Sequence, residues 1–524
     1  MSKSRKSQNK KSAAAKDLVS NRAATLQVPH SNKLALFIIA LILITLGIYA
    51  SSLKNLWTNW DDEGYVLQNK LVTSFDLKSI FSEQVMGNYH PVTVLTEAIE
   101  FHFFHNNAAG FHSVSLLLHL LNVLLLFYFI LRLTQKNIVA FLCALLFAIH
   151  PLHVESVSWV SAQKDLLYVL FYFLSLIFYL QYAEPGRKSA AAYLIVVTCF
   201  ILSLLSKAQA VTFPIVILLI DWYQGRKLSV KSILEKTPFF ILSLVFGIVA
   251  IYAQKASESI QDIALYSFPE RLMFSAYAIV AYLTRLFLPI NLSTYYPYPE
   301  SIGNSFPVAV YTAPLIVIII AFLVFRFRKK YPEVVFGMLF FLVNISLVLQ
   351  LLPVGGAITA DRYSYLSFTG FFFIAAIWLN DVWENKNVVI KNARIPLMAG
   401  VSGWLIFLAI QCQARTKVWY SSETLWKNVI TNYPRVPIAY NDLGSYYQKH
   451  EQLDLAKKNF DVALKLQPDF THALINRCDL FRVQNKIDSA IMDGNRAVKL
   501  KPGDPDTHMN RGIAFSIHRP THQT

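Results

Sequence analysis

Cysteine and charge are scarce in this chain of 524 residues. It has four cysteines, and charged residues make up 15% of it whereas hydrophobic residues make up 55%. No two cysteines stand at metal-site spacing, so neither a disulfide framework nor a cysteine-based zinc site is expected. The low charge and the high apolar content argue against a single soluble domain and are typical of a membrane protein.

The sequence also lacks a glycine-rich phosphate loop, a nucleophile elbow and a dinucleotide fingerprint. Its net charge of +16 would suggest nucleic acid as a partner of a soluble protein. Here, however, the basic residues gather in the N-terminal tail and in short loops between apolar segments, as the positive-inside rule predicts for a membrane protein. We therefore expect membrane lipids, and no nucleic acid, as partners.

Apolar segments long enough to cross a bilayer recur up to about residue 412. A basic tail, residues 1–33, precedes them and is expected to be disordered and cytoplasmic. The apolar segment 271–290 carries Arg285, and we interpret it as an interfacial or re-entrant helix rather than a span. Eleven spans are predicted, at 34–52, 112–133, 137–150, 166–183, 190–206, 208–223, 236–254, 309–327, 332–352, 364–381 and 395–413.

An internal repeat follows the last span. Gly444, Cys478 and Gly512 are spaced by 34 residues, with small residues where two helices would cross. This period is typical of tetratricopeptide repeats (TPR), which bind partner proteins. We expect a short TPR solenoid over 420–515, with a truncated third unit, and an unstructured tail at 516–524.

Two adjacent carboxylates, Asp61 and Asp62, lie just after the first span, in a first outer loop predicted over 53–111. Such a pair at a membrane surface can act as a general base on an incoming hydroxyl or hold a metal ion. The alternatives are a solvated loop and an Asp that caps a following helix. We favour the functional role. The pair permits a divalent metal, which we do not favour, and no other cofactor is predicted.

The segment from His150 to Glu155, followed by Lys164 and Asp165, is predicted to lie on the same outer side. Two histidines and a glutamate within six positions could hold a metal or position an acceptor. We favour a polar contribution to the cavity of Asp62, because His153 and Glu155 need not share a face and no fourth ligand is evident. The alternative is an ordinary histidine–glutamate contact in a wet loop.

Two cations complete the polar residues of this side. Lys207 stands in a very short turn between two spans, and Arg362 follows a glycine-containing loop. Both suit a lipid phosphate, and Arg362 can bind one with two parallel hydrogen bonds. The alternatives are a lysine that reaches the headgroups and a structural ion pair of Arg362 with Asp361 or Glu155.

Along the chain, the motifs come in a fixed order: Trp60-Asp61-Asp62, Tyr89-His90-Pro91, His150 to Glu155 leading to Asp165, Lys207, Ala360 to Tyr363, and the C-terminal repeats. Motifs in this order resemble those of the transmembrane and TPR O-mannosyltransferase family and its bacterial relatives, which are GT-C-type glycosyltransferases. The chain departs from the family where His90 stands in place of a more usual arginine.

The resemblance implies an all-α fold: a polytopic GT-C-like membrane domain of about eleven transmembrane helices at 34–415, followed by the TPR solenoid. It implies an inverting transfer of a sugar, commonly mannose, from a polyprenyl-phosphate or dolichyl-phosphate donor to a protein hydroxyl. The TPR domain would bind the acceptor protein on the periplasmic or lumenal side. The membrane would be the bacterial inner membrane or the endoplasmic reticulum, with the N-terminus cytoplasmic.

Residue roles follow from the same resemblance. Asp62 or Asp61 would be the catalytic base, and no residue is assigned to a metal. The acceptor and the sugar would be bound by four side chains, His90, His153, Glu155 and Asp165. The donor phosphate would be held by Lys207, Arg362 and Tyr363.

Two other functions compete with the enzyme. The first is a non-enzymatic, membrane-anchored TPR scaffold or assembly factor, because repeats alone argue only for partner binding. The second is a transporter or lipid flippase, which we disfavour because the spans show no internal symmetry and the polar motifs cluster on one side.

Overall fold

The computed structural model describes residues 32–518 apart from 185, 187, 228, 257–265, 302, 304 and 352–354. The described part is mostly helical, and the one sheet within it pairs β1 (Tyr296–Pro297) with β2 (Ala357–Thr359). The predicted all-α class is confirmed. The predicted tail 1–33 lies almost wholly outside the described residues.

Six helical segments of the described chain are long and apolar enough to cross a membrane, or up to eight if each of two bent pairs counts as one span. A helix suits a bilayer because it satisfies its own backbone polar groups. The six contain α2 (Asn32–Tyr49), α6 (Ala108–Thr134), α9 (Gln163–Ala183), α13 (Thr237–Ala256), α15 (Val308–Phe327) and α19 (Val388–Val418).

Each bent pair breaks at a polar motif. The first joins α7 (Asn137–Ile149) to the short helices η3 (Pro151–His153) and α8 (Val154–Ser158) at an angle of 58°. The second joins the segment 361–367 to α18 (Thr369–Glu384) at 54°.

Shorter apolar helices complete the bundle, namely α10 (Ala190–Ser206), η5 (Ala208–Thr212) with α11 (Phe213–Tyr223), and α16 (Pro332–Ile345). Every predicted span has a helical counterpart, but the count of eleven crossings stays a prediction.

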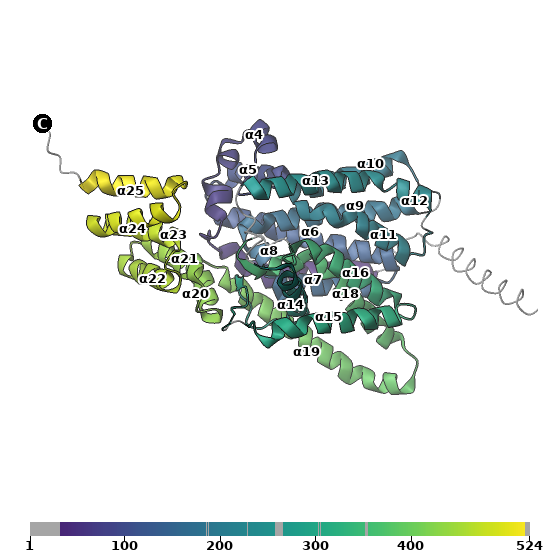
Figure 1. Ribbon diagram of the computed structural model, residues 1–524. Helices are drawn as coiled ribbons and strands as arrows, with labels where there is room; N and C mark the ends of the chain where they lie inside the picture. The colour runs from purple at the N-terminus through teal and green to yellow at the C-terminus, as the bar shows by residue number, and fades with distance from the viewer. Residues whose placement is uncertain are drawn as a thin grey trace, which may run out of the picture.

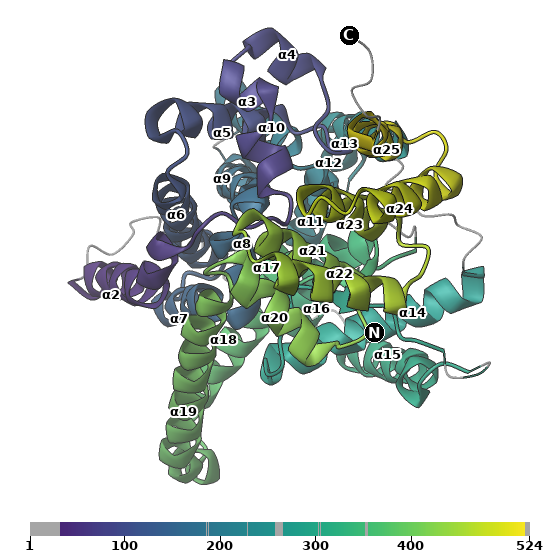
Figure 2. The ribbon, with the colours of Figure 1, turned by 90° about the vertical axis from the view of Figure 1, so that its left-hand side faces the viewer.

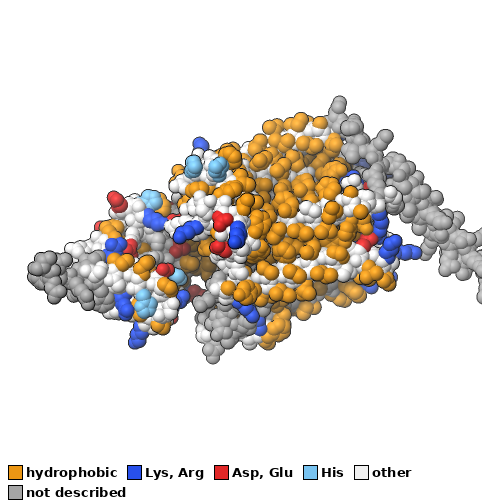
Figure 3. Space-filling model, turned by 90° about the horizontal axis from the view of Figure 1, so that it is seen from above, with side chains coloured by type: hydrophobic (Ala, Val, Ile, Leu, Met, Phe, Trp, Pro, Cys, Tyr) orange, Lys and Arg blue, Asp and Glu red, His pale blue; other side chains and the backbone are white. Residues whose placement is uncertain are grey.

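The bundle has two distinct ends. Figure 1 shows α9, α13 and α15 along its length, with α20–α25 at one end and α12 (Val230–Leu234) at the other. The first outer loop, with α4 (Leu77–Ser82) and α5 (Pro91–Phe104), lies toward the end of α20–α25. Figure 3 shows a broad hydrophobic band on the bundle with charged side chains gathered at both ends. This is the distribution that a membrane domain needs.

Helix α14 (Phe268–Phe287) does not run along the bundle. It is seen end-on in Figure 1 and lengthwise in Figure 2, and it is not among the candidate spans. This placement agrees with the interfacial or re-entrant interpretation of 271–290, whose depth in a membrane stays a prediction.

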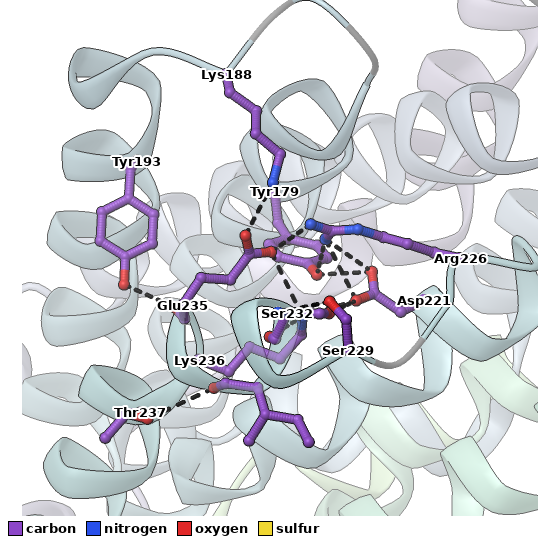
Figure 4. A network of polar contacts seen from close by, with 11 residues as sticks. Tyr179, Lys188, Tyr193, Asp221, Arg226, Ser229, Ser232, Glu235, Lys236 and Thr237 are labelled. Atoms are coloured by element: carbon purple, nitrogen blue, oxygen red, sulfur yellow. Dashed lines mark hydrogen bonds and ion pairs between the residues drawn. The ribbon is translucent and has the colours of Figure 1, made fainter.

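A buried charge network holds the end of the bundle near α12 (Figure 4). Lys236 Nζ lies 2.7 Å from Asp221 Oδ2, and both side chains are almost fully buried. Tyr179 Oη donates to Asp221 Oδ1 at 2.7 Å, and Arg226 bridges Asp221 and Glu235 at 3.3 and 2.5 Å. The network therefore ties α9, α11 and the start of α13 together.

We expect Asp221→Asn to lower the free energy of unfolding by about 1–3 kcal/mol, because it removes the nearer counter-charge of the buried Lys236 and leaves only Glu235, at 3.6 Å. Lys188, whose side chain is 43% exposed, pairs with Glu235 in the same network. The control Lys188→Ala should cost only about 0–1 kcal/mol. Thermal unfolding of both variants in detergent measures the difference, and equal shifts would contradict it.

The six helices after α19 form what we call the repeat domain, residues 422–518. Its helices are α20 (Ser422–Asn432), α21 (Pro437–Lys449), α22 (Leu453–Leu466), α23 (Thr471–Val483), α24 (Ile487–Leu500) and α25 (Pro505–His518). A side chain at Gly444 would meet the Phe460 ring at 2.6 Å, which explains the small residue at this helix crossing. The assignment of these helices to the TPR class stays a prediction.

The predicted boundary at 515 is wrong by three residues. Helix α25 continues to His518, because the next helix breaker in the sequence is Pro520. The rest of the predicted tail, residues 519–524, lies outside the described residues.

Candidate functional site

Asp62 is an anchor of the first outer loop. Its Oδ2 accepts hydrogen bonds from the backbone N–H and the hydroxyl of Thr58, at 2.9 and 2.8 Å. Its Oδ1 accepts from the backbone N–H and the hydroxyl of Ser161, at 3.0 and 2.6 Å. Burial raises the pKa of Asp62 to about 6, although the four hydrogen bonds act in the opposite direction. Its oxygens are therefore committed to tying the loop to η4 (Val160–Ala162).

Asp61 differs from its neighbour. Its backbone has φ +66°, a left-handed conformation that few residues other than glycine adopt. Its carboxylate has no hydrogen-bond partner among the described residues. Burial raises the pKa of Asp61, whereas the positive charges of Lys164 and Arg362 lower it. Asp61 is thus a carboxylate without a structural partner that lies close to two cations.

The structure brings together the three residues predicted to hold a phosphate. Both cations lie against the Tyr363 ring: Lys207 Nζ is 5.7 Å and Arg362 Cζ is 4.8 Å from the ring centroid. Lys207 Nζ also bonds Asp165 Oδ1 at 2.5 Å. Three of the predicted side chains and Asp165 therefore belong to one cluster.

Glu155 is occupied by this cluster as well. It forms an ion pair with Nη1 of Arg362, and its Oε2 accepts from the backbone N–H of Asp361 at 3.1 Å. The structural ion pair considered from the sequence is therefore present. Glu155 holds the second helix break, and with it Arg362, against α8.

Lys164 is a third cation of the cluster, to which the sequence assigned no role of its own. Its Nζ lies 4.0 Å from the centroid of the Tyr65 ring, and its charge acts on both Asp61 and Asp165. The sequence did offer a signal for Lys164, because it is a lysine directly beside Asp165 at the start of a long apolar helix.

Several polar atoms at the start of α5, within it and at the start of α9 are buried. His90, which precedes α5, packs edge-on against the Tyr65 ring at 5.6 Å between ring centroids. Both ring nitrogens of His90, both carboxylate oxygens of Glu97 and Oδ2 of Asp165 are buried and have no hydrogen-bond partner in the described part of the chain. A buried polar atom without a partner costs about 1–3 kcal/mol, so this cluster is suited to a polar ligand.

Burial shifts the pKa values of the ionisable groups in this cluster. Burial raises the pKa of Glu97 to about 8, while Lys164 acts in the opposite direction. Burial and the nearby lysines hold the pKa of His90 well below its usual range. Glu100 accepts from Gln163 Nε2 at 2.7 Å on the same side of α5. The sequence offered a signal that we missed, namely two carboxylates three positions apart in an apolar helix.

His153 lies in the aromatic core, and its predicted role in binding acceptor or sugar stays a prediction. Its ring is fully buried, with centroids 4.6 Å from Phe147 and 4.9 Å from Tyr365, and its Nδ1 bonds the carbonyl oxygen of Phe147 at 2.9 Å. The short helix that begins at Pro151 turns His153 into the aromatic core. Within the described residues, no group of three or more His, Cys, Asp or Glu is placed to hold a metal ion.

No protein-family model matches the chain. It is 26% identical over 456 residues to the protein O-mannosyl-transferase F38B6.6 of Caenorhabditis elegans, which covers 82% of this chain and 63% of that relative. The chain is similar in sequence to proteins named protein O-mannosyl-transferases. The family resemblance seen in its motifs is confirmed.

Shorter matches point to the same relatives. Protein O-mannosyl-transferase TMTC4 of Mus musculus is 30% identical over 186 residues, or 29% of this chain and 25% of that protein. Protein O-mannosyl-transferase TMTC1 of Homo sapiens is 35% identical over 100 residues, or 19% and 11%. The chain spans less than two thirds of the length of these relatives.

One solved structure is also similar. It is the crystal structure of ArnT from Cupriavidus metallidurans bound to undecaprenyl phosphate, with a TM-score of 0.35 and 12% sequence identity. The match covers 78% of this chain and 79% of that one.

The two carboxylates should differ sharply in what they contribute to stability. Asp62→Asn places an amide N–H₂ against two of the four donors, and each buried donor left unpaired costs about 1–3 kcal/mol. Asp61→Asn breaks no hydrogen bond of the carboxylate, and asparagine tolerates a positive φ. We therefore expect thermal unfolding at a clearly lower temperature for Asp62→Asn only. Equal melting temperatures would show that the loop does not depend on Asp62.

Proposed function

We propose that this chain is a GT-C-type membrane glycosyltransferase that moves a sugar from a polyprenyl-phosphate or dolichyl-phosphate donor to a protein hydroxyl. The observation that carries the proposal is the carboxylate of Asp61, which has no hydrogen-bond partner among the described residues and is acted on by the charges of Lys164 and Arg362. Arg362 in turn shares the Tyr363 ring with Lys207.

A purely structural network, such as that of Asp221 and Lys236, pairs its buried charges. The carboxylate of Asp61 has no such partner among the described residues, and a perturbed carboxylate of this kind is typical of a functional site.

The cations suit the phosphate of the donor. Arg362 uses Nη1 for Glu155, and its planar guanidinium is held over the Trp159 ring, 5.1 Å from the centroid. Lys207 supplies a second charge across Tyr363. Both lie where the chain leaves the apolar helices, so the prenyl chain can stay in the membrane while the phosphate meets the cations. Cations placed in this way stabilise the charge of a leaving phosphate in a water-poor site.

Asp61 is the better candidate for the base. Both oxygens of Asp62 accept two hydrogen bonds each, whereas the carboxylate of Asp61 is uncommitted. In a single displacement, Asp61 takes the proton of the acceptor hydroxyl as its oxygen bonds to the anomeric carbon. The bond from that carbon to the phosphate oxygen breaks, and the lipid phosphate leaves with the electron pair. One carboxylate suffices for this inverting reaction.

The sugar has a suitable place behind Asp61. His90, Glu97 and Asp165 offer buried nitrogen and oxygen atoms that lack protein partners, and sugar hydroxyls can donate to or accept from each of them. The names of the relatives favour mannose as the sugar. We assign the acceptor protein to the repeat domain, which contacts Asn59 and Glu63 on the two sides of Asp61.

The two ends of the bundle also predict how the chain is oriented in its membrane. The end that carries Asp61 and the repeat domain would face the periplasm of a bacterium or the lumen of the endoplasmic reticulum. The opposite end, where α2 begins, would face the cytoplasm. The basic loops near α12 lie at that opposite end, in agreement with the positive-inside rule.

Transfer should fall by about 10²–10⁴-fold in Asp61→Asn, because the general base is lost while the fold remains. The matched control is Asp76→Asn, since Asp76 is an exposed carboxylate of the same loop that caps α4 and asparagine caps equally well. The assay follows labelled mannose from polyprenyl-phosphate mannose into protein, in membrane vesicles with equal amounts of each variant. Wild-type transfer by Asp61→Asn would refute its role. Absence of transfer by the wild type, with a cellular defect repaired equally by Asp61→Asn, would favour the scaffold.

The pH dependence of transfer should report Asp61. The base must be ionised, and burial raises the pKa of Asp61, so activity is lost on acidification above the ordinary aspartate value of about 3.9. Lys164 lowers the pKa of Asp61. Lys164→Met should therefore move the acid limb of the kcat/KM profile to higher pH. An acid limb that stays in place or moves to lower pH would contradict the assignment.

A further inference from the structure

Asn59, two residues before Asp61, directs all its polar groups to the repeat domain except its carbonyl. Its backbone N–H donates to Ser422 Oγ at 2.9 Å, and its side-chain Nδ2 donates to the carbonyl oxygen of Asp442 at 2.7 Å. Its Oδ1 accepts from Trp426 Nε1 at 2.8 Å. The three partners come from α20 and α21, more than 360 residues away in the sequence.

Contacts on both sides of Asn59 tie the loop to the repeat domain or to the residues just before it. The backbone N–H of Leu56 donates to the carbonyl oxygen of Tyr420 at 2.8 Å. On the far side of Asp61, Glu63 forms an ion pair with Lys449 at the end of α21. The segment 56–63 is therefore held against the repeat domain both before and after the proposed base. Figure 2, which looks onto this end, shows α20 and α21 lying over α8.

Trp60 fills the seam between the two domains. Its ring centroid lies 5.2 Å from that of Trp159 in the membrane domain and 5.2 Å from that of Trp426 in α20. It also stacks on Trp419 at 6.3 Å with an interplanar angle of 10°. Trp159 Nε1 donates to the carbonyl oxygen of Trp60 at 2.9 Å. The residue next to Asp61 is thus packed from both domains at once.

Asp61 adopts its strained backbone within this seam. A left-handed conformation at a residue other than glycine persists only where its surroundings determine it, at a cost of about 1–3 kcal/mol. Two sets of contacts hold the backbone of Asp61 in this conformation. Asp62 bonds Thr58 and Ser161 on the membrane domain, and Asn59 bonds the repeat domain. The charge of Asp61 also contributes to raising the pKa of Asp442 to about 7, after burial as the main cause, so the two carboxylates are electrostatic neighbours.

We infer that Asn59 is a positioning residue through which helices α20 and α21 hold the loop of Asp61 in its working geometry. The repeat domain then helps to position the catalytic base, in addition to its proposed role in binding the acceptor. This inference rests on the proposed function where it concerns catalysis. It follows that a shift of α20 and α21 would carry Asn59 with it and move the base.

The test compares Asn59→Ala with Asn459→Ala in the full-length protein. Asn459 is an asparagine of the repeat domain whose Nδ2 donates within its own helix, to the carbonyl oxygen of Leu455 at 2.8 Å. Hydrogen–deuterium exchange of residues 55–63 is measured together with kcat and with KM for polyprenyl-phosphate mannose. Ser422→Ala, which removes one partner of Asn59 and leaves its side chain intact, is a milder variant if Asn59→Ala folds poorly.

We expect faster exchange of 55–63 in Asn59→Ala, and a kcat about 10–100-fold lower, because a base displaced by about 1 Å loses this much. KM for the lipid donor should change less than about three-fold, since the cations are untouched. Asn459→Ala should match the wild type in each respect. A structural defect alone would instead lower the amount of folded protein without changing kcat per folded molecule.

Two outcomes would overturn the inference. Wild-type exchange and kcat in Asn59→Ala would show that the contact does not hold the loop. Equal effects of Asn59→Ala and Asn459→Ala would show a general effect on the repeat domain. Hydrogen–deuterium exchange also separates this inference from the proposed function. A wild-type protein without transferase activity would refute the proposed enzyme. The exchange of residues 55–63 would still show whether the repeat domain holds the loop.

Discussion

The burial of the Asp62 carboxylate is the constraint on which the site depends. A buried carboxylate must find hydrogen bonds, and here Thr58 and Ser161 supply four of them. Because Thr58 belongs to the first outer loop and Ser161 to the break before α9, these bonds fix the loop on the membrane domain. With the oxygens of Asp62 committed, the carboxylate of Asp61 has no hydrogen-bond partner among the described residues, and the charges of Lys164 and Arg362 act on it.

The two helix breaks depend on each other in a similar way. A broken helix within an apolar domain frees backbone groups that must be bonded again. Glu155, in the first break, accepts from the backbone N–H of Asp361 in the second and pairs with Arg362. The polar groups that the breaks expose therefore satisfy one another, and the same contacts bring Arg362 to the cluster of Lys207 and Tyr363. The repeat domain closes the arrangement through Asn59 and Trp60.

Much of this could be predicted, since apolar run length and motif chemistry are local properties of a sequence. Each predicted span became a helical segment, and Lys207, Arg362 and Tyr363 came together as their chemistry suggested. Long-range packing decided the rest. Nothing local tells Asp61 from Asp62, because the difference is made by Ser161, 99 residues later. The burial of His153 among Phe147 and Tyr365 could not be read from its residue type. Asn59 gave no signal before its partners were known.

The central claim is that Asp61 faces an anomeric carbon whose lipid phosphate is held by Lys207 and Arg362. The most direct test is a structure of the full-length protein in lipid nanodiscs with a non-hydrolysable polyprenyl-phosphonate mannose. The account predicts the phosphonate within hydrogen-bonding distance of Lys207 and Arg362, the sugar against His90 and Glu97, and the anomeric carbon open to the Asp61 carboxylate. A phosphonate bound away from these cations, or an anomeric carbon that faces away from Asp61, would contradict it.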